Sequence, residues 1–290
     1  MEKIEIIANL NSGKGTGREC LNKAAAYLNE QCIPYEVHET QRKGHAMELA
    51  RELSAQGAKV IVALGGDGTF HEVLNGIDFS VSRMGMIPAG RGNDFSTGTG
   101  AASLDTKKAI AAIVRGDTCD LDYIQVADKR CINIAGTGLD VEVLLKTEKS
   151  KNRLSYVASL FRCLLKFKLY HVEVEVNGEK RTFDCVMAGV CNGSQFGGGI
   201  RLSPVSRADD GVLDLVVMEK PKHTPCLLIM PKFVKGKHMK KPYTTHVLCD
   251  YVKITPPPDS PLELDGEIYY GLPFEASIVK AGLKTFKQLD

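Results

Sequence analysis

The stretch VIVALGGDGTFHEVLNG, residues 60–76, decides the fold of this chain. Its first five residues are apolar or small and rich in β-branched side chains, which predicts a buried strand over Val60–Leu64. Three glycines within the next four residues end that strand. Apolar residues then recur at helical spacing, which predicts a helix over Thr69–Asn75. The stretch therefore has the order of strand, glycine turn and helix.

This order suits a phosphate group. Gly65, Gly66 and Gly68 let the backbone approach a ligand closely, and the unpaired N–H groups at a helix start attract negative charge. Asp67 lies in the middle of the turn, where a carboxylate beside phosphate needs a divalent cation or ordered water between them. The turn thus predicts a nucleotide with Mg²⁺, in preference to a tight connection that merely needs small residues. It lacks the GK[ST] ending of an ordinary P-loop.

Strands and helices alternate through the first part of the chain, which predicts a doubly wound parallel sheet. The other expected strands are 3–8, 35–40 and 84–87, and the other expected helices are 18–28, 45–56 and 104–115. Three glycine-rich stretches, 9–17, 65–69 and 88–94, each follow a strand. Ligands bind outside the carboxyl ends of such strands, so we expect the three loops to form one site.

After about residue 120 the pattern changes to a series of strands, which predicts an antiparallel β-sandwich. The expected strands are 123–127, 130–135, 172–176, 181–191, 213–217, 246–254 and 273–279, interrupted by one core helix, 154–167. We therefore expect a nucleotide-binding α/β domain over 1–121 and a β-sandwich domain over 122–279. Residues 280–290 either close the second domain or return to the first. A cleft between the domains is the expected place of the active site.

Composition narrows the class of protein. The chain has 290 residues, 43% of them hydrophobic, and a net charge of +2, which argues against bulk nucleic-acid binding. It starts directly with a strand pattern and has no apolar run of ~18–20 residues. Nine scattered cysteines without a C-x-x-C pair favour a reducing compartment over a zinc site or a disulfide framework. We therefore expect a cytoplasmic protein without a transition-metal site.

Two further turns concentrate carboxylates. Asp265-Gly266-Glu267 places two acids around a glycine, and Asp209-Asp210 precedes Gly211. Such turns can present carboxylates and backbone carbonyls to a hard cation. Both are also common surface turns, so the residues alone leave the two interpretations open.

Taken in order, these stretches resemble the diacylglycerol kinase catalytic-domain family, most closely its soluble bacterial lipid kinases. The matching stretches are Asn9 with Ser12-Gly13, GGDGT at 65–69 with HEVLNG, P-x-G-x-G-N-D at 88–94, NG at 192–193, GGG at 197–199, SP at 203–204, DDG at 209–211, GKH at 236–238 and DGE at 265–267. They cover nearly the whole chain. The resemblance implies a fold like that of NAD kinases and phosphofructokinases, a β-sandwich domain, and ATP as phosphoryl donor.

The resemblance also implies roles for residues. ATP would be held by Asn9, Ser12, Gly13, Gly65, Gly66, Gly68, Thr69, Gly90, Arg91, Gly92 and Asn93. Asp265 matches the proposed general base of the family, although Asp67 matches the proposed base of the sphingosine kinase branch. Glu267 would join Asp67 and Asp210 in a water network around Mg²⁺. Arg207 and the backbone of Val212 would lie near a structural cation.

Two residues depart from the family pattern. Leu10 stands where proline usually follows the first asparagine, and Arg91 stands where threonine is usual. The fork of an arginine suits phosphate, so Arg91 either binds a phosphate directly or changes the nucleotide or acceptor preference.

We therefore expect an ATP- and Mg²⁺-dependent kinase that phosphorylates the hydroxyl of diacylglycerol or a similar lipid. The alternatives are another acceptor (a sphingoid base, phosphatidylglycerol or a soluble polyol) or a nucleotide-binding regulator without catalysis. A stretch over 220–241 has seven lysines and no acid, and it either docks on an anionic inner membrane face or is a solvated basic loop. A homodimer is left open. His71 is expected on the surface of its helix.

Overall fold

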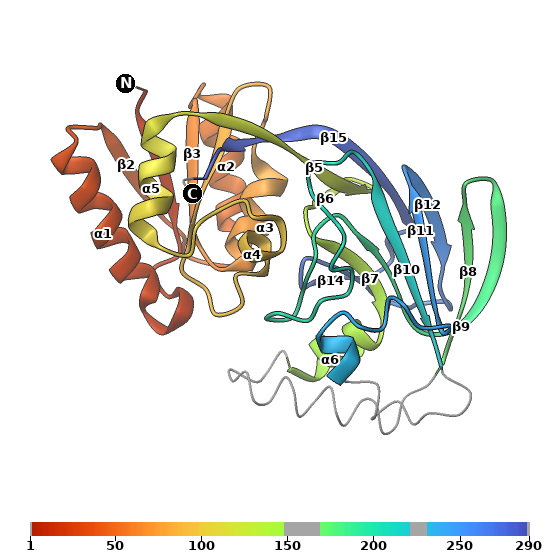
Figure 1. Ribbon diagram of the computed structural model, residues 1–290. Coiled ribbons are helices and arrows are strands. Elements are labelled where there is room, and N and C mark those ends of the chain that lie inside the picture. Colours follow the sequence, from red (N-terminus) through yellow and green to blue (C-terminus); the bar gives the residue numbers. More distant parts are fainter. Residues whose placement is uncertain (1, 148–168, 221–230, 289–290) are drawn as a thin grey trace. The chain divides into compact units, whose positions relative to one another are not determined.

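The computed structural model describes residues 2–147, 169–220 and 231–288 and divides into two compact units (Figure 1). Unit 1 comprises Met1–Tyr123 and Lys280–Asp290, and unit 2 comprises Ile124–Val279. The boundary runs through two strands, β5 (Thr118–Val126) and β15 (Phe274–Phe286). The predicted helix over 154–167 and residues 221–230 of the basic stretch lie outside the described residues. Among the described helices, none is long and apolar enough to cross a bilayer.

Unit 1 contains the predicted parallel sheet, with strand order β2-β1-β3-β4. The strands are β1 (Ile4–Ala8), β2 (Tyr35–Glu39), β3 (Val60–Gly65) and β4 (Arg83–Pro88). Every residue of β1 and β3 is buried, because helices cover both faces of a doubly wound sheet.

The helices of unit 1 lie on both faces of this sheet (Figure 1). They are α1 (Thr16–Glu30), α2 (His45–Ala55), α3 (Asp67–Gly76), α4 (Asp94–Thr99) and α5 (Thr106–Arg115), with a 3₁₀ turn η1 (Ser12–Lys14). α1 packs on α5, and α2 packs on α3. Helix α3 begins two residues earlier than predicted, at Asp67, where an acidic side chain complements the helix dipole.

The end of the chain lies in unit 1. The Thr285 hydroxyl donates to the Met84 carbonyl at 2.7 Å, and the side-chain amide of Gln288 donates to the Ala101 carbonyl at 3.0 Å. These bonds join the last residues of β15 and the segment after it to β4 and to the loop after α4.

Unit 2 is built on an antiparallel sheet with the order β14-β13-β7-β9-β8-β12-β15-β5-β6, and β10 and β11 branch from β9. The elements are β6 (Lys129–Cys131), β7 (Ile134–Gly138), α6 (Leu139–Thr147), β8 (Tyr170–Val176), β9 (Glu179–Cys191), β10 (Leu213–Glu219), β11 (Thr244–Cys249), β12 (Tyr251–Thr255), β13 (Leu262–Leu264) and β14 (Glu267–Tyr269). Apolar side chains from most of these strands form one continuous core. The predicted combination of a parallel α/β part and an antiparallel β part is confirmed.

Two predicted strands are each split in two. The strand expected over 130–135 becomes β6 and β7, and the strand expected over 246–254 becomes β11 and β12. In the first case the backbone N–H groups of Ile132 and Asn133 donate to the Asp265 side chain instead of a neighbouring strand. In the second, the chain changes partner at Asp250, from β10 to β8 and β15.

Candidate functional site

The three predicted glycine-rich loops of unit 1 are bonded to one another. The Asn9 N–H donates to the Leu64 carbonyl at 2.9 Å, which joins the loop after β1 to the end of β3. The Ser12 hydroxyl donates to the Ala89 carbonyl at 3.2 Å, which joins the same loop to the one after β4. The structure therefore brings the three loops together at one edge of the sheet, as the strand order requires.

Glycine is needed where these loops touch. A Cβ built on Gly90 would lie 2.6 Å from the Gly66 α-carbon and 2.8 Å from Oδ1 of Asn93. A Cβ on Gly13, whose φ is 61°, would lie 2.4 Å from the Ala89 carbonyl oxygen. Side chains at these positions would separate the loops, so the glycines keep bare backbone at the site where phosphate is predicted.

Asp67 connects two of the loops. Its Oδ1 accepts the Phe95 N–H at 2.8 Å, so the first residue of α3 holds the start of α4. The Phe70 and Phe95 rings also join α3 to α4 and pack edge to face at 5.5 Å. The Asn9 amide lies 3.5 Å from the Thr69 hydroxyl of α3. Asp67 thus has a structural contact besides the cation role predicted for it.

The loop after β4 is shaped by Asn93. This residue has a left-handed backbone, with φ 54°, and its Oδ1 accepts the Gly90 N–H at 2.9 Å. Asparagine tolerates that conformation better than most residues. Arg91, at the tip between them, is exposed.

The prediction for His71 is wrong. Its side chain is buried, with 2% exposed, because this face of α3 packs inside unit 1. The Asn75 amide donates to the His71 carbonyl at 2.9 Å. Glu72, the next residue, accepts the backbone N–H groups of Gly44 and Ala46 and so caps α2.

In unit 2, Asp265 and Gly266 form the turn between β13 and β14. Both have positive φ, 51° and 86°, as a two-residue hairpin turn of type I′ requires. The Asp265 carboxylate accepts three backbone N–H groups, at 2.8, 2.8 and 3.2 Å, from Ile132, Asn133 and Ile134. These bonds fix the orientation of the carboxylate, which is half-buried.

Weakly acidic groups near this turn stay protonated. Burial, aided by the charges of Asp265 and Glu263, raises the pKa of the Cys131 thiol well above its usual value. Burial and the charge of Glu267 raise the pKa of the Tyr269 hydroxyl.

The turn over 209–211 is held by contacts of its own side chains. The Arg207 guanidinium binds Asp209 through two bonds, of 2.9 and 3.0 Å, while Oδ1 of Asp210 accepts the Val212 N–H at 3.2 Å. The buried Asp214, which no sequence motif indicated, accepts the Ser206 hydroxyl at 2.6 Å and anchors this loop. Asp210 itself is exposed.

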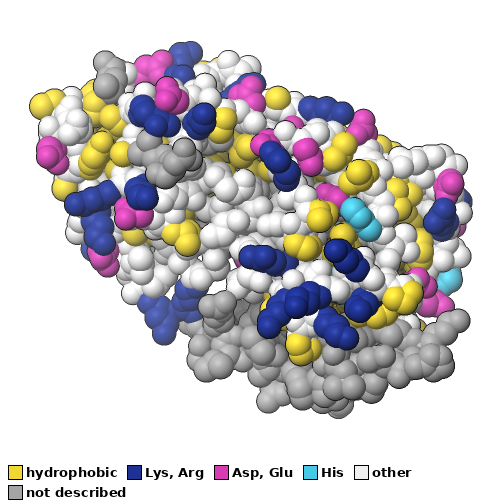
Figure 2. All heavy atoms as spheres, viewed as in Figure 1, with side chains coloured by type: hydrophobic (Ala, Val, Ile, Leu, Met, Phe, Trp, Pro, Cys, Tyr) yellow, Lys and Arg dark blue, Asp and Glu magenta, His cyan; other side chains and the backbone are white. Residues whose placement is uncertain are grey.

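The described part of the basic stretch presents its cations outward. Phe233 and His238 are buried, whereas the lysines around them are exposed; they are Lys232, Lys235, Lys237 and Lys240, with Lys241 partly exposed. Figure 2 shows lysine and arginine side chains gathered on one part of unit 2.

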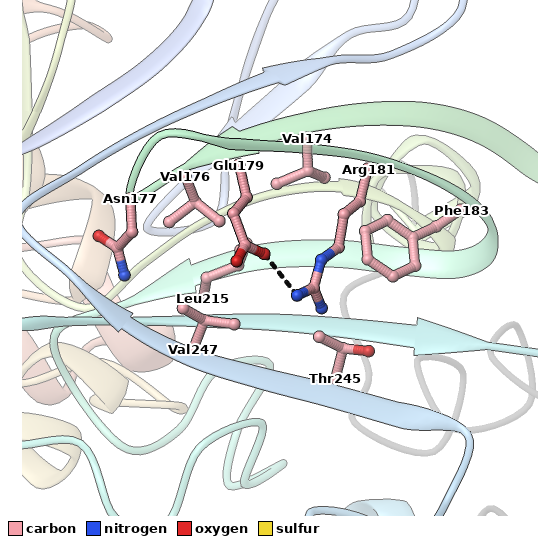
Figure 3. Close-up of a pocket in the computed structure, with 9 residues that line it drawn as sticks. All are labelled: Val174, Val176, Asn177, Glu179, Arg181, Phe183, Leu215, Thr245 and Val247. Atoms are coloured by element: carbon pink, nitrogen blue, oxygen red, sulfur yellow. Dashed lines mark hydrogen bonds and ion pairs between the residues drawn. The ribbon is translucent and has the colours of Figure 1, made fainter.

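A pocket of about 230 Å³ opens between β8, β9, β10 and β11 (Figure 3). Val176, Phe183 and Val247 give it apolar walls, and Glu179 and Arg181 form an ion pair beside them. Its volume is below the ~300–1,000 Å³ of typical small-molecule sites, so we assign it no role in binding the acceptor.

One group of described residues has the atoms for a metal ion, although the sequence showed no ligand spacing. Glu5, Glu36 and His38 have ligand atoms within 4.8 Å of one another. The Lys3 ammonium group binds both glutamates, at 3.0 and 2.5 Å. It already supplies positive charge there, so we interpret the group as an ion-pair network.

Comparisons with known proteins agree with this geometry. Residues 3–126 match the diacylglycerol kinase catalytic domain, and residues 133–287 match the YegS C-terminal NAD kinase beta sandwich-like domain. The chain belongs to the diacylglycerol kinase and YegS family of lipid kinases. The predicted family is thereby confirmed, and a kinase of this family implies ATP as its nucleotide.

Individual relatives cover nearly the whole chain. It is 28% identical to the diacylglycerol kinase of Bacillus subtilis over 95% of this chain and 93% of the relative. It is 30% identical to the lipid kinase YegS of Escherichia coli over 94% of this chain and 93% of the relative. A crystal structure of a diacylglycerol kinase from Bacillus anthracis is similar in fold, with a TM-score of 0.77 and 20% identity over 99% of this chain and 97% of that one.

Proposed function

We propose that this member of the family transfers the γ-phosphoryl group of ATP, with Mg²⁺, to the hydroxyl of diacylglycerol or a similar lipid. With diacylglycerol the product is phosphatidic acid. The observation that carries the proposal is the Asp265 turn, in which three backbone N–H groups hold one carboxylate in a fixed orientation.

Unit 1 supplies the nucleotide-binding part of the proposal. The loops at Ser12–Gly13, Gly65–Thr69 and Gly90–Asn93 present backbone with little side-chain cover, which fits phosphate. Asp67 would hold Mg²⁺ through water, and Arg91 would contact a phosphate. Bound Mg-ATP supplies an activated phosphoryl group whose charge the cation neutralises.

Unit 2 supplies the groups for the acceptor. Asp265 would take the proton from the lipid hydroxyl as that oxygen attacks phosphorus, and general bases of this kind contribute about 10²–10⁴-fold. Its bonds to the β6–β7 connection support this role, because an oriented base needs no reorganisation during transfer. Glu267 and Asp210 would extend the water network around the cation, with Arg207 and the Val212 carbonyl near a structural ion.

A lipid acceptor also requires contact with a membrane. The outward-pointing lysines of residues 232–241 support peripheral docking on an anionic leaflet, and a cytoplasmic location would give access to it.

The test is an acceptor panel. The protein is incubated with γ-labelled ATP and Mg²⁺ in mixed micelles that contain diacylglycerol, monoacylglycerol, ceramide, sphingosine or phosphatidylglycerol, with NAD as a soluble control. We expect label in diacylglycerol above all others. Label in another lipid would identify that lipid as the acceptor in place of diacylglycerol. Label in NAD would overturn the lipid assignment. Nucleotide binding without any transfer would indicate a regulator.

A further inference from the structure

Two buried carboxyl groups lie over the same glycine of β7. Gly136 is paired in register with Glu263 of β13, and Asp140 follows in the first turn of α6. A Cβ built on Gly136 would lie 2.2 Å from Oδ2 of Asp140 and 3.6 Å from Oε1 of Glu263. Only 3% of Asp140 and 1% of Glu263 is exposed. The two carboxyl groups therefore share the space that the missing side chain leaves.

Their hydrogen bonds differ. Oε2 of Glu263 accepts the Gly266 N–H at 2.8 Å, so this side chain holds the second residue of the Asp265–Gly266 turn. Among the described residues, neither oxygen of Asp140 accepts a hydrogen bond of good geometry, and only the backbone N–H groups of Asp140 and Val141 act on the carboxyl group from nearby. A buried carboxylate with so little hydrogen bonding is strongly unfavourable, and a second negative charge beside it adds repulsion.

A single proton resolves both problems. A protonated Asp140 is neutral, and its O–H is a donor for Oε1 of Glu263 across the space above Gly136. Glu263 then keeps its charge, which strengthens the bond that it accepts from the Gly266 N–H.

We propose that Asp140 and Glu263 share one proton and that this pair positions the Asp265–Gly266 turn. Its catalytic consequence rests on the proposed function, in which Asp265 is the base. Asp140 and Glu263 touch no substrate in this account and are positioning residues.

The surroundings agree with a proton on Asp140. Burial raises the pKa of Asp140 to about 7, against a smaller effect of nearby amides at the start of α6. The pKa values of Tyr170 and Cys185 are raised to about 12, and burial raises those of Cys131 and Cys191 well above their usual value. These four groups stay neutral near pH 7. The charge of Asp140 acts on Tyr170 of β8 and on Cys185 and Cys191 of β9, and the charge of Glu263 acts on Cys131 of β6 and on Cys191. Other carboxylates act on the same groups, among them Glu142 on α6, Asp214 on β10 and Asp265 in the turn after β13.

The direct test is a carboxyl ¹³C NMR titration of Asp140 in the full-length protein, its Glu263→Gln variant and the control Asp259→Asn. Asp259 is an exposed turn residue that also has positive φ, 60°. We expect a midpoint near pH 7 in the unaltered protein and in the control, and at least one pH unit lower in Glu263→Gln. A midpoint that does not move in Glu263→Gln would mean that burial acts alone, and a midpoint near pH 4 in the unaltered protein would mean that Asp140 is ionised. Either result overturns the pair.

Melting curves give a second test, with Asp140→Asn. A carboxyl whose pKa is raised on folding stabilises the fold below its unfolded pKa of about 4, and this stabilisation is lost as the pH rises toward 7. The melting temperature of the unaltered protein should therefore fall from pH 5 to pH 7.5 relative to Asp140→Asn. A difference that does not change with pH contradicts the proposal.

Activity separates the pair from the proposed function. Above pH 7 the unaltered enzyme should lose kcat at constant KM for ATP, and Asp140→Asn should lack this decline. An identical pH profile in both would contradict the positioning role. The NMR and melting experiments need no substrate, so a failure to phosphorylate any lipid would overturn the proposed function and not the shared proton.

Discussion

At the scale of single residues, glycines at the loop contacts decide what the nucleotide-binding part can do. Gly66 and Gly90 bring two backbones together, and Asn93 accepts the Gly90 N–H. The sequence predicted these residues because each glycine-rich stretch directly follows a predicted strand. It could not indicate that Asp67 binds the Phe95 N–H, because that bond joins residues 28 positions apart.

Gly90→Ala should weaken ATP binding at least tenfold, because the methyl group would push the Gly66 loop and the Asn93 side chain away. Isothermal titration with Mg-ATP measures this. Gly85→Ala in β4 is the control, since its methyl group would meet the Ile113 side chain and affect stability alone. Equal affinity in Gly90→Ala and the unaltered protein would show that this contact is unimportant for the nucleotide.

His238 makes the stability of unit 2 depend on pH. Burial lowers its pKa to about 4, so the folded protein holds it neutral, whereas the unfolded chain binds a proton below about pH 6.5. Its contribution is complete above pH 6.5 and is lost by about 1.4 kcal/mol per pH unit as the pH falls toward 4. Urea unfolding at pH 7, 5.5 and 4.5 should show this slope, and His238→Leu should reduce it. The exposed His171 serves as control, and a slope that persists in His238→Leu would contradict the assignment.

At the scale of elements, the sequence predicted the helices and strands of unit 1 almost completely, because buried strands and amphipathic helices have clear periodic patterns. It missed α4 and α6. α4 is only six residues long and contains a glycine, and α6 begins directly after the Gly138 that ends β7. The burial of Asp140 and Glu263 was also not predicted, because polar residues inside a fold do not follow the periodic pattern of apolar residues.

Glu72 should stabilise α2 through its cap. Glu72→Ala removes the acceptor for two backbone N–H groups at the start of α2, so we expect a loss of about 1–2 kcal/mol in the free energy of unfolding. Denaturant unfolding measures it, with the exposed Glu52→Ala of the same helix as control. A change below about 0.5 kcal/mol would show that the cap contributes little.

At the scale of the whole molecule, the resemblance to a family gave the fold and the type of reaction. The acceptor cannot be deduced in the same way, because the side chains that determine lipid specificity lie outside the motifs that the family shares. Contact with a membrane is expected from the basic stretch over residues 220–241.

The lysines of this stretch should bind anionic vesicles. Replacing Lys235, Lys237 and Lys240 by glutamine should weaken sedimentation with phosphatidylglycerol vesicles by roughly fivefold per lysine, about 1 kcal/mol each. The matched control replaces Lys59, Lys107 and Lys108 by glutamine, which changes the net charge by the same amount. All three of these lysines are exposed. Equal losses in both triple variants would indicate a general charge effect and contradict a docking surface.

The central claim is that an oriented Asp265 carboxylate makes this chain a lipid kinase. The most direct measurement is transfer of label from γ-labelled ATP to diacylglycerol by the unaltered protein, Asp265→Asn and Asp259→Asn, at ATP concentrations shown to saturate each. We predict labelled phosphatidic acid from the unaltered protein and from Asp259→Asn, and at least a 100-fold lower rate from Asp265→Asn with unchanged ATP affinity. Near-normal transfer by Asp265→Asn would contradict the base assignment, and no labelled lipid from the unaltered protein would contradict the account as a whole.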